Sequence, residues 1–147
     1  KFLKLFSKAC RSKGKKSSSC VAPALGGAYI DVKNWAKKTK KKGSRGEVHH
    51  MPSQKAIKAA LGMSTRRTPS IWMEVKHHQK TASWGNSGIA AKHSGTQAML
   101  LKKDKWCAAI EMDVWDVRSK PFGYKYEAGI RQMQLTLPMT IGRTCAF

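Results

Sequence analysis

The chain has 147 residues, enough for one modest domain, and its 29 lysine and arginine residues outnumber eight acidic ones, giving a formal charge of +21. A surface this cationic attracts polyanions, most often DNA or RNA, and makes their binding steeply dependent on salt. No run of about 18 apolar residues is present, so we expect no membrane-spanning helix, and the basic segments lack the apolar face of a membrane-surface helix. An acidic protein partner is equally compatible with this charge.

The first third of the chain is the most basic part. Residues 1–46 contain 14 of the lysines and arginines and a single acid, Asp31. Two runs rich in lysine and serine there are too poor in apolar residues to fold alone, while the small-residue stretch 21–30 between them could pack on a domain or form a linker. We therefore expect residues 1–45 to form a basic, largely irregular arm and residues 46–147 to form one compact domain. Because the chain begins with Lys1, we also expect it to be a piece of a longer polypeptide.

Beyond the arm, local signals predict alternating short elements. A short strand or loop is expected over 47–51 before Pro52, and a helix over 54–61, with Ser53 as its cap and Gly62 as its stop. The stretch 70–75 is the best candidate for a second strand. Apolar residues at three- to four-residue spacing predict helices from 96 onward, over 106–117 and over 124–135. The chain is thus expected to be an α+β protein.

Cysteines and methionines give weaker indications. The four cysteines lack the spacing of a zinc knuckle. Cys107 lies in an apolar helical pattern and is expected to be a buried free thiol, whereas Cys10 and Cys20 could form a disulfide in an oxidising compartment. His93 matches no motif and is expected at the surface or at a helix cap. The methionines expected to fill the core are Met112, Met133 and Met139.

Two adjacent histidine pairs, His49-His50 and His77-His78, contain four of the five histidines. Neighbours in an extended segment point to opposite sides of the backbone, so one can bind a metal while the next faces a scissile phosphate. A neutral imidazole with a pKa near its usual value of about 6.5 can take a proton from water, which suits His50 to the role of general base. The plainer interpretation is that each pair is a polar surface dipeptide.

A metal site requires ligands from more than one segment, and the chain between the two pairs is long enough to bring them together. Imidazole suits zinc or nickel and can also join the water-rich shell of magnesium or manganese. Such a divalent ion would stabilise charge on the phosphate and on the leaving oxygen.

Several further short blocks follow the first pair in a fixed order. They are His49-His50-Met51-Pro52-Ser53, Met73-Glu74, His78-Gln79-Lys80-Thr81-Ala82-Ser83-Trp84-Gly85, Ala109-Ile110-Glu111-Met112-Asp113, Asp116-Val117-Arg118-Ser119 and Phe122-Gly123-Tyr124-Lys125-Tyr126. Together they resemble the HNH/endonuclease VII superfamily, the ββα-metal or His-Me finger nucleases, as found at the C-termini of bacterial polymorphic toxins of the Rhs and contact-dependent inhibition types. The resemblance covers roughly residues 46–133.

This resemblance implies a small treble-clef ββα-metal core with additional C-terminal helices. It makes His49 a metal ligand, His50 the general base and His78 the ligand that completes the metal shell. His77 stands where relatives usually have an acid and is a further candidate ligand. Glu47 is a candidate catalytic residue, and both Glu47 and Ser83 could orient the histidines.

The function expected from these observations is that of a metal-dependent endonuclease toxin, with DNA the favoured substrate. The resemblance implies secretion or delivery as part of a larger toxin, action in the cytoplasm of a target bacterium during interbacterial competition, and an acidic immunity protein in the producer. Two alternatives stay open: a non-enzymatic basic nucleic-acid-binding module, and a ribonuclease toxin that uses two histidines as acid and base. Candidate contacts to the nucleic-acid backbone are Arg66, Arg67, Lys76, Lys80, Lys40, Lys41 and Lys42.

Overall fold

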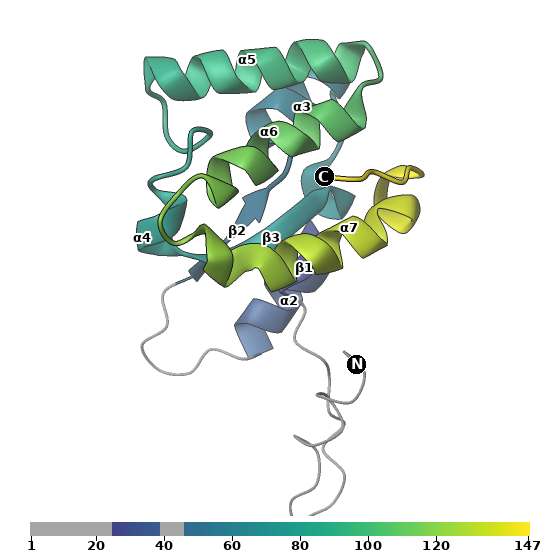
Figure 1. Ribbon diagram of the computed structural model, residues 1–147. Helices are drawn as coiled ribbons and strands as arrows, with labels where there is room; N and C mark the ends of the chain where they lie inside the picture. Colours follow the sequence, from purple (N-terminus) through teal and green to yellow (C-terminus); the bar gives the residue numbers. More distant parts are fainter. Residues whose placement is uncertain (1–24, 39–45) are drawn as a thin grey trace, which may run out of the picture.

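The computed structural model describes residues 25–38 and 46–147. The expected phosphate contacts Lys40, Lys41 and Lys42 and the possible Cys10–Cys20 disulfide lie outside these residues. Within them the chain is an α+β protein with a three-stranded antiparallel sheet in the order β1-β3-β2 (Figure 1). The strands are β1 (Gly26–Ala28), β2 (Gly46–His50) and β3 (Pro69–Glu74).

Six α-helices accompany this sheet in the described part of the chain. They are α2 (Tyr29–Lys38), α3 (Gln54–Leu61), α4 (Val75–His78), α5 (Gly88–Lys102), α6 (Trp106–Arg118) and α7 (Glu127–Ile141), with short 3-10 turns η1 (Thr65–Arg67) and η2 (Gly123–Tyr126). The predicted helix over 54–61 is confirmed: Ser53 accepts a hydrogen bond from the Ala56 amide, and Gly62 ends the helix at a φ of 60°. Helix α5 begins well before residue 96, because Ser87 caps it through the Ala90 amide.

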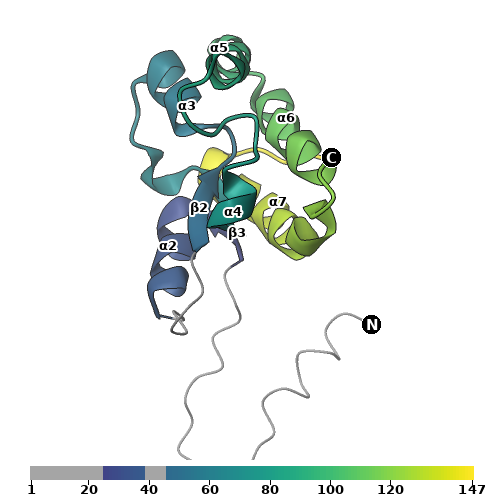
Figure 2. The same cartoon turned by 90° about the vertical axis from the view of Figure 1, so that its left-hand side faces the viewer.

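The larger core cluster lies between β3 and helices α6 and α7. Helices α2 and α7 flank the sheet on opposite sides, and α3, α5 and α6 pack together beyond it (Figure 2). Ile71 and Met73 of β3 are fully buried against residues of α6 and α7. A second cluster joins α3, α5 and α6 around Ile57, Leu101 and Trp106. No described helix is both long enough and apolar enough to cross a membrane.

Part of the expected arm belongs to the folded domain, which corrects the boundary at residue 45. Strand β1 pairs with β3, and α2 packs against β2 and β3. Gly26 lies so close to α7 that a Cβ there would stand 1.8 Å from the Gly129 carbonyl oxygen. The Leu25 carbonyl also accepts a hydrogen bond of 2.8 Å from the Trp72 amide. Residues 25–38 are therefore an edge of the sheet and a covering helix.

Three smaller expectations are also corrected. Cys107 is not a free thiol, because the C-terminal tail returns to α6 and places Cys145 in a disulfide with it. Met139 is 78% exposed, although Met133 in the same helix is buried as expected. His93 is neither on the surface nor at a cap, since its Nε2 lies 2.8 Å from an oxygen of the buried Asp113.

Candidate functional site

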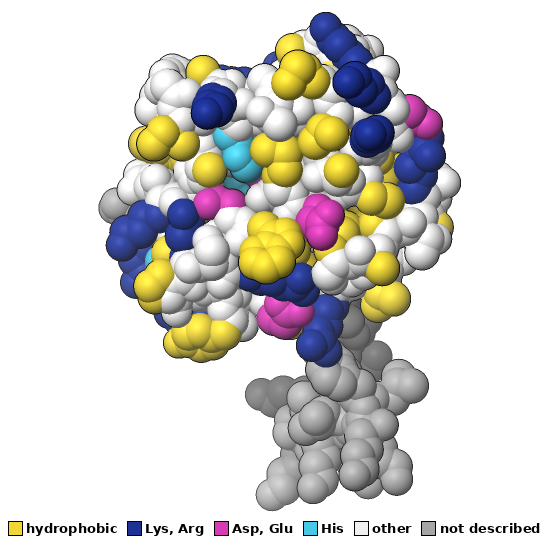
Figure 3. Space-filling model, turned by 45° about the horizontal axis from the view of Figure 1, so that its top comes forward, with side chains coloured by type: hydrophobic (Ala, Val, Ile, Leu, Met, Phe, Trp, Pro, Cys, Tyr) yellow, Lys and Arg dark blue, Asp and Glu magenta, His cyan; other side chains and the backbone are white. Residues whose placement is uncertain are grey.

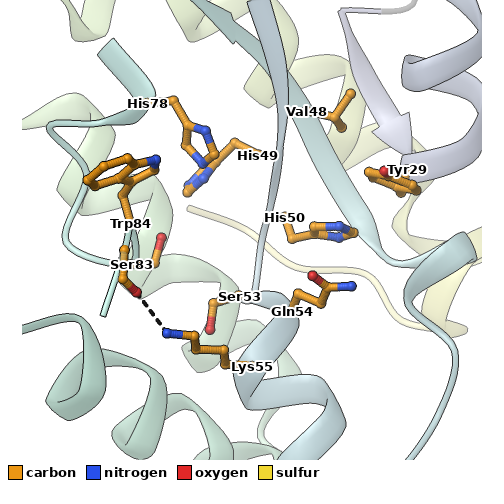
Figure 4. A pocket seen from close by; sticks show the side chains of 11 residues that line it. Tyr29, Val48, His49, His50, Ser53, Gln54, Lys55, His78, Ser83 and Trp84 are labelled. Atoms are coloured by element: carbon orange, nitrogen blue, oxygen red, sulfur yellow. Dashed lines mark hydrogen bonds between the residues drawn. The ribbon is translucent and has the colours of Figure 1, made fainter. Parts of the chain in front are cut away.

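Strand β2 carries the first histidine pair at its end and presents the two rings on opposite sides of the backbone (Figure 4). This confirms the alternation that the sequence predicts for neighbours in a strand. Pairing with β3 places His49 opposite Ile71 and His50 opposite Ser70. The strand therefore gives each histidine a different environment.

His49 and His78 lie next to one another in the first of these environments. Their ring centroids are 4.9 Å apart and the rings meet edge to face. Because β2 and β3 are antiparallel, α4 begins beside the start of β2, and His78 Nδ1 lies 2.7 Å from Glu47 Oε2. A neutral imidazole that donates from Nδ1 to a carboxylate keeps an unprotonated Nε2.

His49 has the features of an unused nitrogen ligand. Its side chain is buried, and its Nε2 has no hydrogen-bond partner among the described residues. Burial, and next the neighbouring His78, hold the pKa of His49 well below its ordinary value, so the ring is neutral at physiological pH. A buried polar atom without a partner is costly, and an ion or substrate oxygen would satisfy it.

The hydrogen bonds around His50 determine which of its nitrogens carries the proton. Its Nδ1 lies 2.9 Å from Thr68 Oγ1 and 3.4 Å from Ser70 Oγ. Both hydroxyls donate to backbone carbonyls, Thr68 to that of Thr65 and Ser70 to that of Thr68. They are therefore acceptors toward His50, whose Nδ1 must donate, and its Nε2 holds the free lone pair.

Tyr29 holds the His50 ring from the other side. The two rings stack with centroids 4.3 Å apart and an interplanar angle of 16°. Burial, followed by the nearby His78, Lys33 and Lys58, lowers the pKa of His50 to about 4. This corrects the expected pKa near 6.5: the His50 imidazole is neutral at pH 7 and oriented, with the lone pair on Nε2, but it is a weaker base than a free imidazole.

The two sides of β2 open into one pocket of about 290 Å³. Trp84, 44% exposed, and Ser83 form one wall together with the loop before α5, and the Lys55 ammonium donates to the Gly85 carbonyl at 2.7 Å (Figure 4). Lys55 also bonds the Asn86 side chain. The residues that line the pocket are Tyr29, Val48, His49, His50, Ser53, Gln54, Lys55, His78, Ser83, Trp84 and Gly85.

A buried polar network holds Ser53, one of the residues that line this pocket. The Ser53 amide donates to Gln97 Oε1 at 3.1 Å, and Gln97 Nε2 donates to Asp113 at 2.6 Å. His93 bonds the other oxygen of Asp113. The hydrogen bond to Asp113 raises the pKa of His93, and burial raises the pKa of the Asp113 carboxyl. Helices α5 and α6 thereby anchor the turn that follows His50.

The second histidine pair is divided between the pocket and the core. His77 stacks on Phe122 with ring centroids 4.1 Å apart, and its Nδ1 lies 2.5 Å from the Tyr126 hydroxyl. It does not line the pocket. The prediction of His77 as a metal ligand is therefore not supported by its position, because the first turn of α4 directs His77 and His78 to different neighbours.

The described side chains offer too few donors to complete the coordination shell of a metal ion by themselves. His49 and His78 offer two imidazole nitrogens, and Glu47 orients one of them. No group of three or more histidine, cysteine, aspartate or glutamate side chains converges anywhere in residues 25–38 and 46–147. Two imidazole nitrogens suit zinc or nickel better than magnesium, and such an ion would take its other ligands from water and phosphate oxygens.

The predicted cationic contacts differ in their availability. Arg66 and Arg67 are exposed on η1, next to α2, and Lys80 is exposed after α4. Lys76 instead pairs with Glu74 at 3.1 Å. On the face shown in Figure 3, lysine and arginine side chains gather in groups while acidic side chains are few and scattered. Arg66, Arg67 and Lys80 are thus exposed and form no ion pair among the described residues, whereas Lys76 is paired with Glu74.

Sequence reasoning missed the side chains that hold His50. Thr68 and Ser70 carry no motif, and finding them requires the register of β2 against β3. Tyr29 lies in the stretch expected to belong to the arm. Lys55 and Trp84 lie in recognisable segments, but only the fold places them on one pocket. The chain matches no protein-family model, no curated protein and no solved structure.

Proposed function

We propose that this domain is a metal-dependent endonuclease with a ββα-metal type of site, and that DNA is its favoured substrate. The observation that carries this proposal is the state of His50: a neutral imidazole with its Nδ1 proton committed to Thr68 and its Nε2 free, in the same pocket as His49 and His78. This is the arrangement that a general base for water requires. The charge of +21 favours a polyanionic substrate.

In the proposed reaction each residue has a distinct task. His50 Nε2 takes a proton from the attacking water, while Thr68 and Tyr29 keep its ring oriented. His49 and His78 would hold a divalent cation, which when bound supplies positive charge next to the phosphate. Glu47 keeps the His78 ring in place through its 2.7 Å contact. Exposed cations, among them Arg66 and Arg67, would hold the flanking backbone.

The biological role proposed with this activity is that of a toxin delivered into a competing bacterium as part of a longer polypeptide. Its support is the sequence resemblance together with the strongly basic charge. A producer of such a nuclease needs protection, and an acidic immunity protein would find this surface rapidly because opposite fields steer the encounter. That partner and the cytoplasm of the target cell as the site of action belong to the proposal.

A ribonuclease is the second candidate, and one observation favours it. His50 and His78 reach one pocket from two elements, and the described residues supply no third protein ligand for a metal. Two histidines so placed can act as base and acid in metal-free RNA cleavage.

The test is to incubate purified protein with plasmid DNA and with total RNA, each with and without EDTA. The proposed nuclease nicks plasmid only without the chelator, the ribonuclease cleaves RNA in its presence, and a non-enzymatic module binds without cleaving either. His50→Ala is expected to lower the cleavage rate at least about 100-fold, because it removes the base, while DNA binding stays close to that of the wild type. Cleavage by this variant at the wild-type rate would contradict the role of His50.

A further inference from the structure

A second hollow of about 350 Å³ lies between α2 and β2, next to the proposed active site. It shares Tyr29 and Val48 with the histidine pocket, so the two hollows adjoin at the ring that supports His50. Apart from Tyr29 and Val48, the residues that line the hollow lie at the start of β2 and on one face of α2. We call this second hollow the α2–β2 groove; it is lined by Tyr29, Lys33, Ala36, Lys37, Gly46, Glu47 and Val48.

The helix side of the α2–β2 groove carries a cationic stripe. Tyr29, Lys33 and Lys37 follow one another at intervals of four residues and therefore lie on one face of α2, with neighbouring Cβ atoms about 5–6 Å apart. Lys33 is half-buried, with its ammonium 5.2 Å from the centre of the Tyr29 ring, and Lys37 is exposed. Neither lysine takes part in an ion pair among the described residues.

Among the described residues that line this groove, Glu47 is the one with an acidic side chain, and this carboxylate already has a hydrogen-bond partner. Its Oε2 accepts from His78 Nδ1 at 2.7 Å. The ammonium groups of Lys33 and Lys37 thus face a groove whose carboxylate is bonded to an imidazole. A row of ammonium groups that starts beside a candidate catalytic base has the chemistry of a phosphate track.

We propose that the α2–β2 groove binds the phosphodiester backbone of a nucleic-acid strand directly beside the phosphate that is cleaved. The position of the scissile phosphate rests on the proposed function, whereas the binding of a strand by Lys33 and Lys37 does not. The preferred substrate is then a polynucleotide that extends past the scissile bond toward α2. A small phosphodiester that fills only the histidine pocket lacks this contact.

The experiment measures binding separately from cleavage. Wild-type protein in EDTA is titrated, by fluorescence anisotropy at several salt concentrations, into a labelled single-stranded DNA of about 20 nucleotides, longer than the usual site of one small domain. The test variant is Lys33→Gln with Lys37→Gln. The matched control is Lys92→Gln with Lys102→Gln, which removes the same charge from exposed positions on α5, far from the groove (Figure 1).

The groove variant is expected to bind about tenfold more weakly, with a log–log salt slope smaller by about 1.4, because each lost single-strand phosphate contact removes about 0.7. The control should keep the wild-type slope. Lys37→Gln alone, at an exposed position, should lower the slope by about 0.7, half of the decrease expected for the double variant. It guards against an effect of Lys33 on the packing of Tyr29. Circular dichroism and thermal unfolding establish that each variant is folded.

Different outcomes overturn different conclusions. If the groove variant matches the control in affinity and slope, the α2–β2 groove is not the strand site, whatever the protein cleaves. If the groove variant loses binding but the wild type cleaves neither DNA nor RNA, the groove proposal holds and the nuclease proposal fails. If the wild type binds no nucleic acid, both the groove proposal and the nuclease proposal fail. An acidic protein is then the expected partner of the cationic stripe.

Discussion

Adjacent residues in this chain lie in different environments, and the second histidine pair shows this most clearly. His78 reaches the pocket and contacts Glu47, whereas His77 stacks in the core on Phe122 and bonds the Tyr126 hydroxyl. A histidine dipeptide thus supplies one candidate ligand and one structural side chain. The sequence alone could not show which of the two histidines reaches the pocket. That depends on the direction in which the four-residue helix α4 turns after β3.

This division predicts different effects of two neighbouring substitutions. His78→Ala is expected to weaken the binding of zinc or nickel at least about tenfold, since it removes one of two imidazole donors. His77→Ala should leave metal affinity unchanged and lower the free energy of unfolding, because it removes the ring that packs against Phe122 and Tyr126. Calorimetric titration and urea unfolding measure the two effects, and a loss of metal affinity in His77→Ala instead would exchange the two roles.

At the scale of elements, the sequence predicted best what local interactions decide. Helix α3 was predicted to its end residues because Ser53 and Gly62, which flank it directly in the sequence, signal its two ends. The sequence also placed β2, expected as a short strand or loop, and β3 to within a residue or two at each end, and predicted the opposite directions of His49 and His50. By contrast, β1 consists of Gly26, Gly27 and Ala28 and has no pattern of its own, so only its pairing with β3 makes it a strand. Thr68 and Ser70, the partners of His50, could not be predicted either, because only the pairing of β2 with β3 brings them next to it.

The packing of β1 against α7 predicts a sharp difference between two glycines. Gly26→Ala is expected to lower the free energy of unfolding by at least about 2 kcal/mol, because its Cβ would overlap the Gly129 backbone. Gly95→Ala is the matched control: Gly95 lies inside α5 with open space around its Cβ position, and alanine there should raise stability by about 0.5–1 kcal/mol. Urea unfolding of both variants decides this, and equal stabilities would show that β1 can move away from α7.

At the scale of the whole molecule, the domain is assembled from both ends of the described chain. Strand β1 is held by β3 and by α7, near the other end, and the Tyr29 ring at the start of α2 supports the candidate base. The basic first third of the sequence suggested an arm separate from the catalytic domain. Charge alone did not reveal that α2 belongs to the fold. Lys33, Lys37 and Lys38 make this helix strongly basic, although its Val32 is fully buried.

Removal of residues 1–45 is accordingly expected to abolish cleavage even at saturating nucleic acid. The deletion takes away β1, α2 and the Tyr29 ring, so the shortened protein should also lose most of its cooperative unfolding transition. Circular dichroism on heating and a single-turnover cleavage assay measure the two losses. A truncated protein that unfolds cooperatively and cleaves at the wild-type rate would restore the boundary at residue 45.

The disulfide between Cys107 and Cys145 has a consequence for any passage of this domain through a membrane channel. It joins positions 38 residues apart and keeps that length of chain in a closed loop after every helix has unfolded. A channel that admits one extended chain cannot admit this loop, because two strands must pass it side by side. Threading through so narrow an opening therefore requires both thiols to be reduced during transit, so the bond can form only after arrival in an oxidising medium. A wider conduit would carry the domain with the loop closed.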